Sequence, residues 1–566
     1  MRVAIQLCFF LAFALACEFR SQTPADLVLR GGKVVTLNSE RPVAEAIAVT
    51  GERITAIGAT NELDEYIGPE TRVIELGGAL AIPGLIDAHA HFMDLGSSRM
   101  TLDLFGTKSA EEISTLVLQN VEQASEEAWI QGHGWDQNHW DVKEFPTQVA
   151  LDDVSPDHPV FLTRVDLHAG WANTKAMELA GVTPEMEDPD GGEIVRDEDG
   201  KPTGIFIDNA MGLITDKIPP PSDEKRWEAF RRAQRACLEN GITSFHDAGV
   251  DEATIDLYRQ ADEHDELKVR IYAMIWGSDE KLLERYFSHK PLISPRLTIR
   301  SVKLLVDGAL GSRGAAMLDG YSDRPEWTGL MILSEEDIYR ISDRALTAGY
   351  QVAAHAIGDR ANRETLNAFE KAFAKHGEAS DPRFRIEHAQ ILDRADIRRF
   401  AQLGVVAAMQ GVHATSDMPW IAERVGEDRT AEGAYVWAKL LGSGVRIANG
   451  TDAPVESLSA LDCFYASITR QDKNGEPENG WYPEHRMSRQ QALRSYTLDA
   501  AYAAFEENEK GSIEPGKLAD ITVVSKDIMT VQPRDILNTE ILYTIIGGEV
   551  VFQKEAGEST QTTSNP

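Results

Sequence analysis

Two histidines spaced one residue apart, His89 and His91, end an apolar run that begins at Ala81. On a β-strand, residues two apart project from the same face, so both imidazoles would point into one small volume. A strand can offer a metal ion two ligands in this way. A histidine pair with this spacing is often incidental, however. If the strand is buried, its two imidazoles need polar partners. The metal hypothesis therefore depends on which polar residues accompany the pair.

After residue 222, short β-rich segments alternate with amphipathic helical stretches, as in a parallel βα barrel or a doubly wound sheet. The helical stretches, such as the one that follows Ser334, have ordinary N-caps and apolar stripes and carry no chemistry. Eight strands favour the barrel, an α/β fold of the (β/α)8 TIM-barrel type. The predicted strands are residues 82–91, 241–247, 268–275, 297–307, 351–355, 384–388, 404–410 and 445–452.

In barrels of this kind the carboxyl ends of the strands build the active site. Several polar residues fall at or near these ends. Each alone has a structural explanation, such as a hydrogen-bonded core histidine or a solvated carboxylate. Their joint position favours one common site. The six residues are His89, His91, Lys303, His355, His388 and Asp452.

The segments around these residues resemble the amidohydrolase superfamily of metal-dependent hydrolases. A long segment between the first two barrel strands is most similar to the amidohydrolase 3 branch, typified by N-substituted formamide deformylase. One departure is Gly411 after Gln410, where the branch usually has proline, so the shape of this loop is not implied. The matching segments are PGLIDAHAH, VKLLVDGALGSR, AAHAIGDRA, RIEHAQ and ANGTDAPV, with GSIEPGKLADI near the carboxyl end.

The resemblance implies two divalent cations, which sit about 3.5 to 4 Å apart in two-metal hydrolytic sites. His89 and His91 would bind one ion, and Asp452 would complete its ligands. His355 and His388 would bind the other ion. Zinc suits imidazole and carboxylate ligands best, although manganese, iron and cobalt fit as well. A single-metal site, as in the superfamily's deaminases, is the alternative.

By the same resemblance, Lys303 would bridge both ions. An ammonium group cannot bind a cation, but a neutral amine can react with carbon dioxide to give a carbamate with two oxygens. Burial lowers the pKa of a lysine and makes this reaction feasible. The alternative is an ion pair with Asp307, which lies four residues on and on the same face of the strand.

The implied activity is hydrolysis of a carbon–nitrogen bond in a small, non-peptide amide. The ions would activate a water molecule and polarise the substrate carbonyl. Asp452 would take the water proton as general base and deliver it to the departing nitrogen as general acid. His413, after the seventh strand, and His168, in the long insert, would hydrogen-bond the substrate or its oxyanion, with a structural role as the alternative.

Three further residues, Asp307, Arg313 and Asp359, would orient the ligands or close loops, unless they form only surface ion pairs and caps. The same site could also cleave a cyclic amide, an ester or a lactone, or deaminate. A non-catalytic scaffold is a further alternative, but all six expected ligand positions are filled. An apolar or aromatic substrate would explain the frequent tryptophans, and core packing explains them equally well. These are Trp135, Trp140, Trp171, Trp420 and Trp437.

At 566 residues and 42% hydrophobic, the chain can bury a barrel core with a second domain beside it. Alternating segments predict a β-sandwich from both chain ends, residues 24–80 plus 510–555. The barrel would span residues 81–509, with an inserted subdomain at about 97–222. A net charge of −35 argues against nucleic acid or anionic membrane surfaces as partners. A homodimer and a monomer both stay open.

Residues 1–23 have the features of a secretion signal with a short linker. The apolar run 3–16 is too short to span a bilayer comfortably. Residues 14–17, ALAC, resemble a bacterial lipobox, which would make Cys17 the lipidated first residue of an exported, periplasmic or membrane-anchored lipoprotein. Simple signal cleavage and a tail that merely packs are the alternatives. Cys237 and Cys463 are too few for a disulfide framework, and residues 556–566 are predicted to be a disordered tail.

Overall fold

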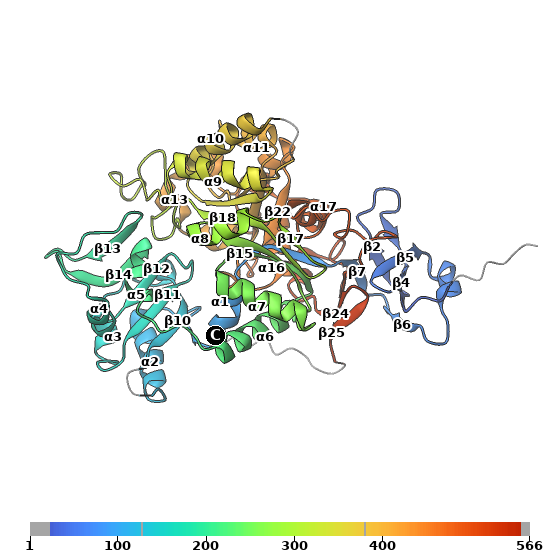
Figure 1. Ribbon diagram of the computed structural model, residues 1–566, viewed down its shortest axis with the longest axis horizontal. Helices are drawn as coiled ribbons and strands as arrows, with labels where there is room; N and C mark the ends of the chain where they lie inside the picture. The colour runs from blue at the N-terminus through green and yellow to red at the C-terminus, as the bar shows by residue number, and fades with distance from the viewer. Residues whose placement is uncertain (1–22, 126–127, 378–380, 556–566) are drawn as a thin grey trace, which may run out of the picture.

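The computed structural model describes residues 23–125, 128–377 and 381–555. A barrel occupies the middle of the molecule, with the insert at one end and two small sheets at the other (Figure 1). The predicted signal segment up to residue 22, Cys17 and the predicted tail at 556–566 lie outside the described residues.

Eight parallel strands form the barrel sheet, in which each strand pairs with its neighbours in chain order. The ring closes beyond the first and last strands, where the Asp452 amide donates to the His89 carbonyl and the His91 amide to the Ala453 carbonyl, both at 2.8 Å. The predicted (β/α)8 barrel is therefore confirmed. Its strands are β8 (Leu85–Ala90), β15 (Ile242–Val250), β16 (Arg270–Trp276), β18 (Leu297–Leu305), β19 (Gln351–Ala356), β20 (Arg385–His388), β21 (Val406–Gln410) and β22 (Ile447–Gly450), with β17 (Leu292–Ile293) paired to β18.

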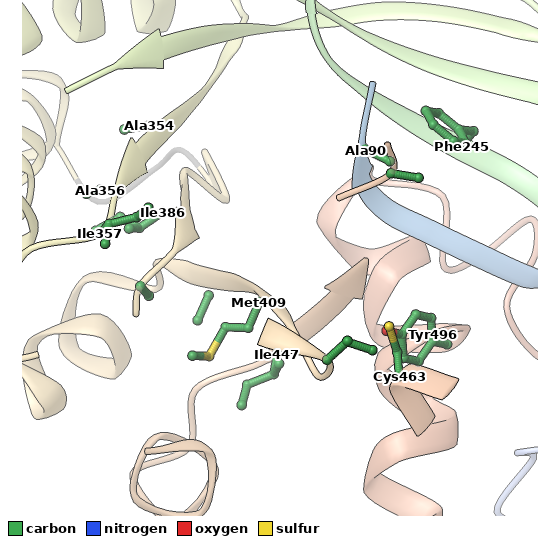
Figure 2. Packing of buried hydrophobic residues seen from close by; sticks show 14 of the residues in the cluster. Ala90, Phe245, Ala354, Ala356, Ile357, Ile386, Met409, Ile447, Cys463 and Tyr496 are labelled. Carbon is green, nitrogen blue, oxygen red and sulfur yellow. The ribbon is translucent and has the colours of Figure 1, made fainter. Parts of the chain in front are cut away.

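Helices surround the strands and bury their apolar stripes against them. Ile386, Met409 and Ile447 of three neighbouring strands belong to this core, part of which Figure 2 shows. These helices include α6 (Asp223–Glu239), α7 (Glu252–Glu263), α8 (Glu280–Phe287), α9 (Glu335–Ala348), α10 (Asp359–His376), α11 (Ile397–Leu403), α16 (Ala460–Thr469), α17 (Arg489–Ser495) and α18 (Leu498–Ala503).

The first predicted strand, residues 82–91, is divided between two sheets. Its beginning belongs to β7 (Leu80–Pro83), which pairs with strands outside the barrel, and the barrel strand starts at Leu85. Gly84 makes the transition because a Cβ there would lie 2.3 Å from Oγ1 of Thr243. The prediction of one strand over residues 82–91 is therefore wrong. The strand is interrupted at Gly84, where only a glycine permits the close contact with Thr243.

Both ends of the chain build two further sheets that share one apolar core, including Leu29, Ile47, Val523 and Ile545. Blue and red strands lie side by side there in Figure 1. The four-stranded sheet has the order β5 (Arg53–Gly58), β4 (Ala46–Thr50), β1 (Leu27–Arg30) and β6 (Arg72–Glu75). The six-stranded sheet has the order β25 (Glu549–Gln553), β24 (Ile541–Ile546), β23 (Ile521–Val524), β7, β2 (Lys33–Val35) and β3 (Val43–Ala44).

The insert between β8 and β15 follows α1 (Phe92–Ser98) and forms a mixed six-stranded sheet. Apolar clusters cover both of its faces, one with α2 (Ala110–Val121) and α3 (Val149–Asp152), the other with α4 (Thr174–Ala180) and α5 (Gly212–Thr215). It therefore has a core of its own. Its strands run in the order β13 (Gly192–Arg196), β14 (Pro202–Asp208), β12 (Ala169–Ala172), β11 (Val160–Arg164), β10 (Ile130–Trp135) and β9 (Leu102–Asp103).

Gly411 follows β21 directly, at the position where the sequence departs from the branch pattern. A Cβ at this position would lie 2.4 Å from the Cys463 carbonyl oxygen and 2.5 Å from Oγ of Ser467, both in α16. A substituent here would push α16 away from the end of the strand. We expect Gly411→Ala to lower the free energy of unfolding by about 1–3 kcal/mol, measured by denaturant titration. Gly442→Ala is the control because nothing lies within 4 Å of its Cβ position, and an equal loss in both variants would contradict the packing argument.

Candidate metal centre

The carboxyl ends of the barrel strands bring three predicted ligands into one buried cluster. Ligand atoms of His89, His388 and Asp452 all lie within 4.8 Å of one another. The Oδ1 atom of Asp452 is 3.4 Å from Nε2 of His89 and 3.2 Å from Nε2 of His91. Its Oδ2 atom is 4.0 Å from Nδ1 of His388. The Asp452 carboxylate therefore lies among three imidazoles.

Two further predicted ligands, His355 and Lys303, adjoin this cluster. The His355 ring lies 4.6 Å from the His388 ring, centroid to centroid. The Nζ atom of Lys303 is 3.4 Å from Nε2 of His89. Among the described residues, no carboxylate oxygen comes within 4 Å of this nitrogen, so the alternative of a Lys303–Asp307 ion pair does not hold. Burial lowers the pKa of Lys303 to about 8.

Asp307 instead receives backbone hydrogen bonds from the segments that follow β18 and β19. Its carboxylate accepts from the amides of Ala316, Ile357 and Gly358 at 2.8–3.0 Å. Its Oδ1 atom is 3.5 Å from Nε2 of His355. Burial raises the pKa of Asp307 to about 7, although the three amides oppose this. Asp307 thus lies against the predicted ligand His355.

The chemistry of this donor set fits divalent cations. Within the described part of the chain, Oδ1 of Asp452 and Nε2 of His355 are buried and have no hydrogen-bond partner. A buried polar atom without a partner is costly unless a ligand satisfies it. Burial, together with the charges of neighbouring groups, holds the pKa of His355 and His388 well below the ordinary value. Both imidazoles are therefore neutral, which is the form that binds metals.

Sequence reasoning missed a buried ion pair beneath His89. The Glu387 carboxylate hydrogen-bonds Nδ1 of His89, which leaves Nε2 facing the cluster. Arg385 donates to the two Glu387 oxygens at 2.7 and 2.8 Å and to the Ala88 carbonyl at 2.6 Å. A carboxylate behind a histidine fixes its tautomer and orientation. The signal was two charges spaced two apart in the buried strand segment RIEHAQ.

His388 directly follows Glu387, yet both side chains act at the same site. Strand alternation alone would place them on opposite faces. His388 has a φ of 71° and Ala389 a φ of 44°, so the chain leaves β20 in the left-handed region. Asp452 likewise has a φ of 62°. Strained backbone of this kind is concentrated at functional sites, where it redirects side chains.

Comparison with known proteins agrees with this geometry. The model of a family described as "Amidohydrolase family" matches residues 72–552. The chain belongs to the amidohydrolase family. Two solved structures of uncharacterized metal-dependent hydrolases resemble it. The one from Pyrococcus furiosus has a TM-score of 0.70 and 28% identity over 89% of this chain and 100% of its own. The one from Pyrococcus horikoshii OT3 has a TM-score of 0.72 and 27% identity over 90% and 99%.

Curated relatives match this amidohydrolase over almost its whole length. The putative amidohydrolase YtcJ of Bacillus subtilis is 32% identical over 93% of this chain and 99% of its own. Protein LONG AFTER FAR-RED 3 of Arabidopsis thaliana is 34% identical over 93% and 92%. N-substituted formamide deformylase of Arthrobacter pascens is 26% identical over 94% and 98%. The amidohydrolase is therefore a metal-dependent hydrolase that uses a divalent metal.

A cavity of about 600 Å³ adjoins the cluster of predicted ligands in the amidohydrolase. Both predicted substrate-binding histidines line it. His413 begins α12 (His413–Asp417), and its Nε2 atom lies 3.6 Å from Oδ2 of Asp452. His168 comes from the insert, holds Oδ1 of Asp208 at 2.5 Å through Nδ1, and lies 5.0 Å from the His355 ring, centroid to centroid. The insert thus forms part of the cavity wall.

The remaining predicted residues of the amidohydrolase lie elsewhere. Arg313 pairs with Asp323 at 2.8 Å, and Asp359 accepts from the Leu318 amide at 2.8 Å. Neither is among the described residues that line the cavity, and these contacts connect loops. Of the five tryptophans named in the sequence, Trp420 alone lines the cavity. The other four are core residues: Trp135, Trp140, Trp171 and Trp437.

Proposed function

We propose that this amidohydrolase cleaves the carbon–nitrogen bond of a small, non-peptide amide. The position of Asp452 carries the proposal, because its buried carboxylate stands among the clustered imidazoles and at the cavity. From there it can take a proton from an attacking water and deliver it to the departing nitrogen. The relation to a protein named N-substituted formamide deformylase supports an amide substrate.

We propose zinc as the metal and two ions as the full complement. His89, His91 and Asp452 would hold one ion, His355 and His388 the other, and a carbamate on Lys303 would bridge them. Such ions supply Lewis acidity, which lowers the pKa of water and polarises a carbonyl. The low pKa of Lys303 supports the carbamate, since only the neutral amine reacts with carbon dioxide.

His413 and His168 would position the substrate carbonyl. Because Nδ1 of His168 is bound to Asp208, its Nε2 atom is left to hydrogen-bond a substrate in the cavity. Burial lowers the pKa of His168, but the Asp208 carboxylate raises it and prevails. A donor fixed in this way can stabilise negative charge that develops on the carbonyl oxygen.

A panel of N-formyl, N-acetyl, aminoacyl and cyclic amides, with an ester and a lactone, tests the reaction class on metal-loaded protein. We expect amine release from the formyl or acetyl amides. Cleavage of the ester or lactone alone would contradict the proposal.

One observation favours a second candidate, a single-metal deaminase or hydrolase, because the tight cluster of His89, His388 and Asp452 could hold one ion. Elemental analysis distinguishes the two candidates, because the proposed amide hydrolase would hold two metal ions per chain and the second candidate one.

We expect Lys303→Ala to lose bound metal and activity, because the bridging oxygens disappear. Small carboxylic acids such as acetate and propionate should restore part of both, since a carboxylate can occupy the place of the carbamate. Metal content by elemental analysis and amide turnover are the measurements. Lys510→Met is the control. Lys510 is a second buried lysine, which donates to Oγ of Ser244 near the amino-terminal end of β15, so this variant should keep its bound metal. Full metal content and activity in Lys303→Ala would refute the bridge.

We also propose export, with Cys17 as the lipidated residue, because residues 1–23 have the features of a secretion signal and residues 14–17 resemble a lipobox. No helix among the described residues is long and apolar enough to cross a membrane. Mass spectrometry of the mature amino terminus from membrane fractions tests the proposed export. We also propose that the partners are small molecules rather than nucleic acid, given the net charge of −35.

A further inference from the structure

Two carboxylates on one wall of the cavity lack a cationic partner. Asp417, at the end of α12, accepts hydrogen bonds from the Tyr435 hydroxyl and, at 2.5 Å, from Nε2 of Gln390. Glu456 accepts from the Ser416 hydroxyl at 2.5 Å. Among the described residues, no Lys, Arg or His nitrogen lies within 4 Å of either carboxylate. Both line the cavity and keep their capacity to pair with a positive charge.

The wall continues into the insert with three more carboxylates that share few positive charges. Asp136 and Asp166 both pair with the buried guanidinium of Arg164, and Oδ2 of Asp136 also lies 3.7 Å from Nε2 of His139. Asp208 pairs with His168 through Oδ1, while its Oδ2 atom is buried and has no hydrogen-bond partner within the described chain. Asp208 is 8% exposed and lines the cavity. Within the described chain this oxygen is therefore an unmet hydrogen-bond acceptor at the cavity wall.

Aromatic side chains stand in the same cavity, independently of the acids. Trp276 and Trp420 both line it. The face of an indole ring attracts cations through its quadrupole. Two lysines line the cavity among the described residues. One is Lys303, the proposed bridging residue, and the other is Lys108, which is exposed. The surroundings of a bound ligand therefore combine carboxyl groups that lack a cationic partner with aromatic faces.

We propose that this cavity selects amides whose amine portion carries a second, protonated nitrogen, the class of N-acyl diamines, with that ammonium group held by Asp417 and Glu456. The inference rests on the proposed amide hydrolysis. Asp417 lies four residues after His413 in α12, on the same helix face and about 6 Å along the axis. Nε2 of His413 lies 3.6 Å from Oδ2 of Asp452. A short alkyl chain therefore spans the distance from an amide group at Asp452 to an ammonium group at Asp417.

Three formamides of equal chain length test the charge preference on the metal-loaded enzyme. N-formyl-diaminobutane carries a terminal ammonium, N-pentylformamide a methyl group, and N-formyl-aminopentanoate a carboxylate. We expect kcat/KM for the cation to exceed that for the neutral amide by about tenfold or more, with the anion lowest. The preference should shrink as salt is raised, because screening weakens partly exposed charge pairs.

Glu456→Gln keeps the oxygen that accepts from Ser416 and removes only the charge, so it should reduce the ratio of cationic to neutral turnover several-fold. Asp417→Asn should do the same. Asp428→Asn, an exposed acid outside the cavity lining, is the matched control and should keep the ratio. A ratio near one in the natural protein, or one that neither cavity variant changes, would overturn the inference.

A binding measurement separates this inference from the hydrolytic function. Calorimetry on the metal-loaded protein should detect diaminobutane but not butanediol, and Glu456→Gln should weaken the binding. If no amide is cleaved but diaminobutane binds in this way, the reaction is wrong and the cation subsite stands. Equal heats for both compounds, with formamides still cleaved, would reject the subsite alone.

Discussion

Asp452→Asn should lower kcat for the proposed amide hydrolysis by on the order of 10²- to 10⁴-fold, because the chain then lacks the group proposed to move the proton. Asparagine has the same shape and tolerates the left-handed backbone at this position, where φ is 62°. The variant should therefore fold normally. Steady-state turnover of the best substrate of the panel measures the effect, with circular dichroism to verify the fold.

Metal content must be determined on the same sample, since Asp452 is also a proposed ligand. A loss of turnover that remains at full metal content isolates the proton-transfer role. Asp359→Asn is the matched control, because this carboxylate is equally buried but receives the Leu318 amide outside the cavity. Its kcat should stay within about threefold of the natural value. An Asp452→Asn enzyme that kept most of its activity would overturn the mechanism.

Glu387→Gln should weaken metal binding by about 10- to 100-fold, because the carboxylate that orients His89 is lost. It should also lower the free energy of unfolding by about 3–5 kcal/mol, since Arg385 would remain buried without its ion-pair partner. Competition with a chelator measures the first effect and denaturant titration of the metal-free protein the second. Glu370→Gln is the control, an exposed pair with Arg399 that should change stability by less than about 1 kcal/mol.

The same residue gives a pH dependence of stability with a defined sign. Glu387 is buried, but the Arg385 guanidinium and His89 overcome the effect of burial and hold its pKa far below the ordinary value of 4.5. A lowered folded-state pKa contributes stability that is fully present above the ordinary value and is lost as pH falls below it. The natural protein should therefore lose stability more steeply than Glu387→Gln between about pH 4.5 and 2. Parallel curves would contradict this role.

Much of the metal centre could be predicted from the sequence. A period of two placed His89 and His91 on one face, and the βα rhythm predicted the barrel that the structure confirms. His355 and Asp452 followed because the carboxyl ends of parallel strands meet at one end of a barrel. These inferences depend on local periodicity and on one topological rule, both of which a sequence carries.

The sequence was sufficient to predict the barrel, the set of candidate ligands and the family resemblance that implies their role. The surroundings of these ligands became known from the folded chain alone. Glu387 reaches His89 across 298 positions of the chain, and Asp208 and Asp417 face one cavity from different parts of the chain. Left-handed backbone at His388 and Asp452 reverses the alternation that a strand pattern assumes. The physical reason is that such contacts depend on how separately formed elements pack, and no local spacing records this.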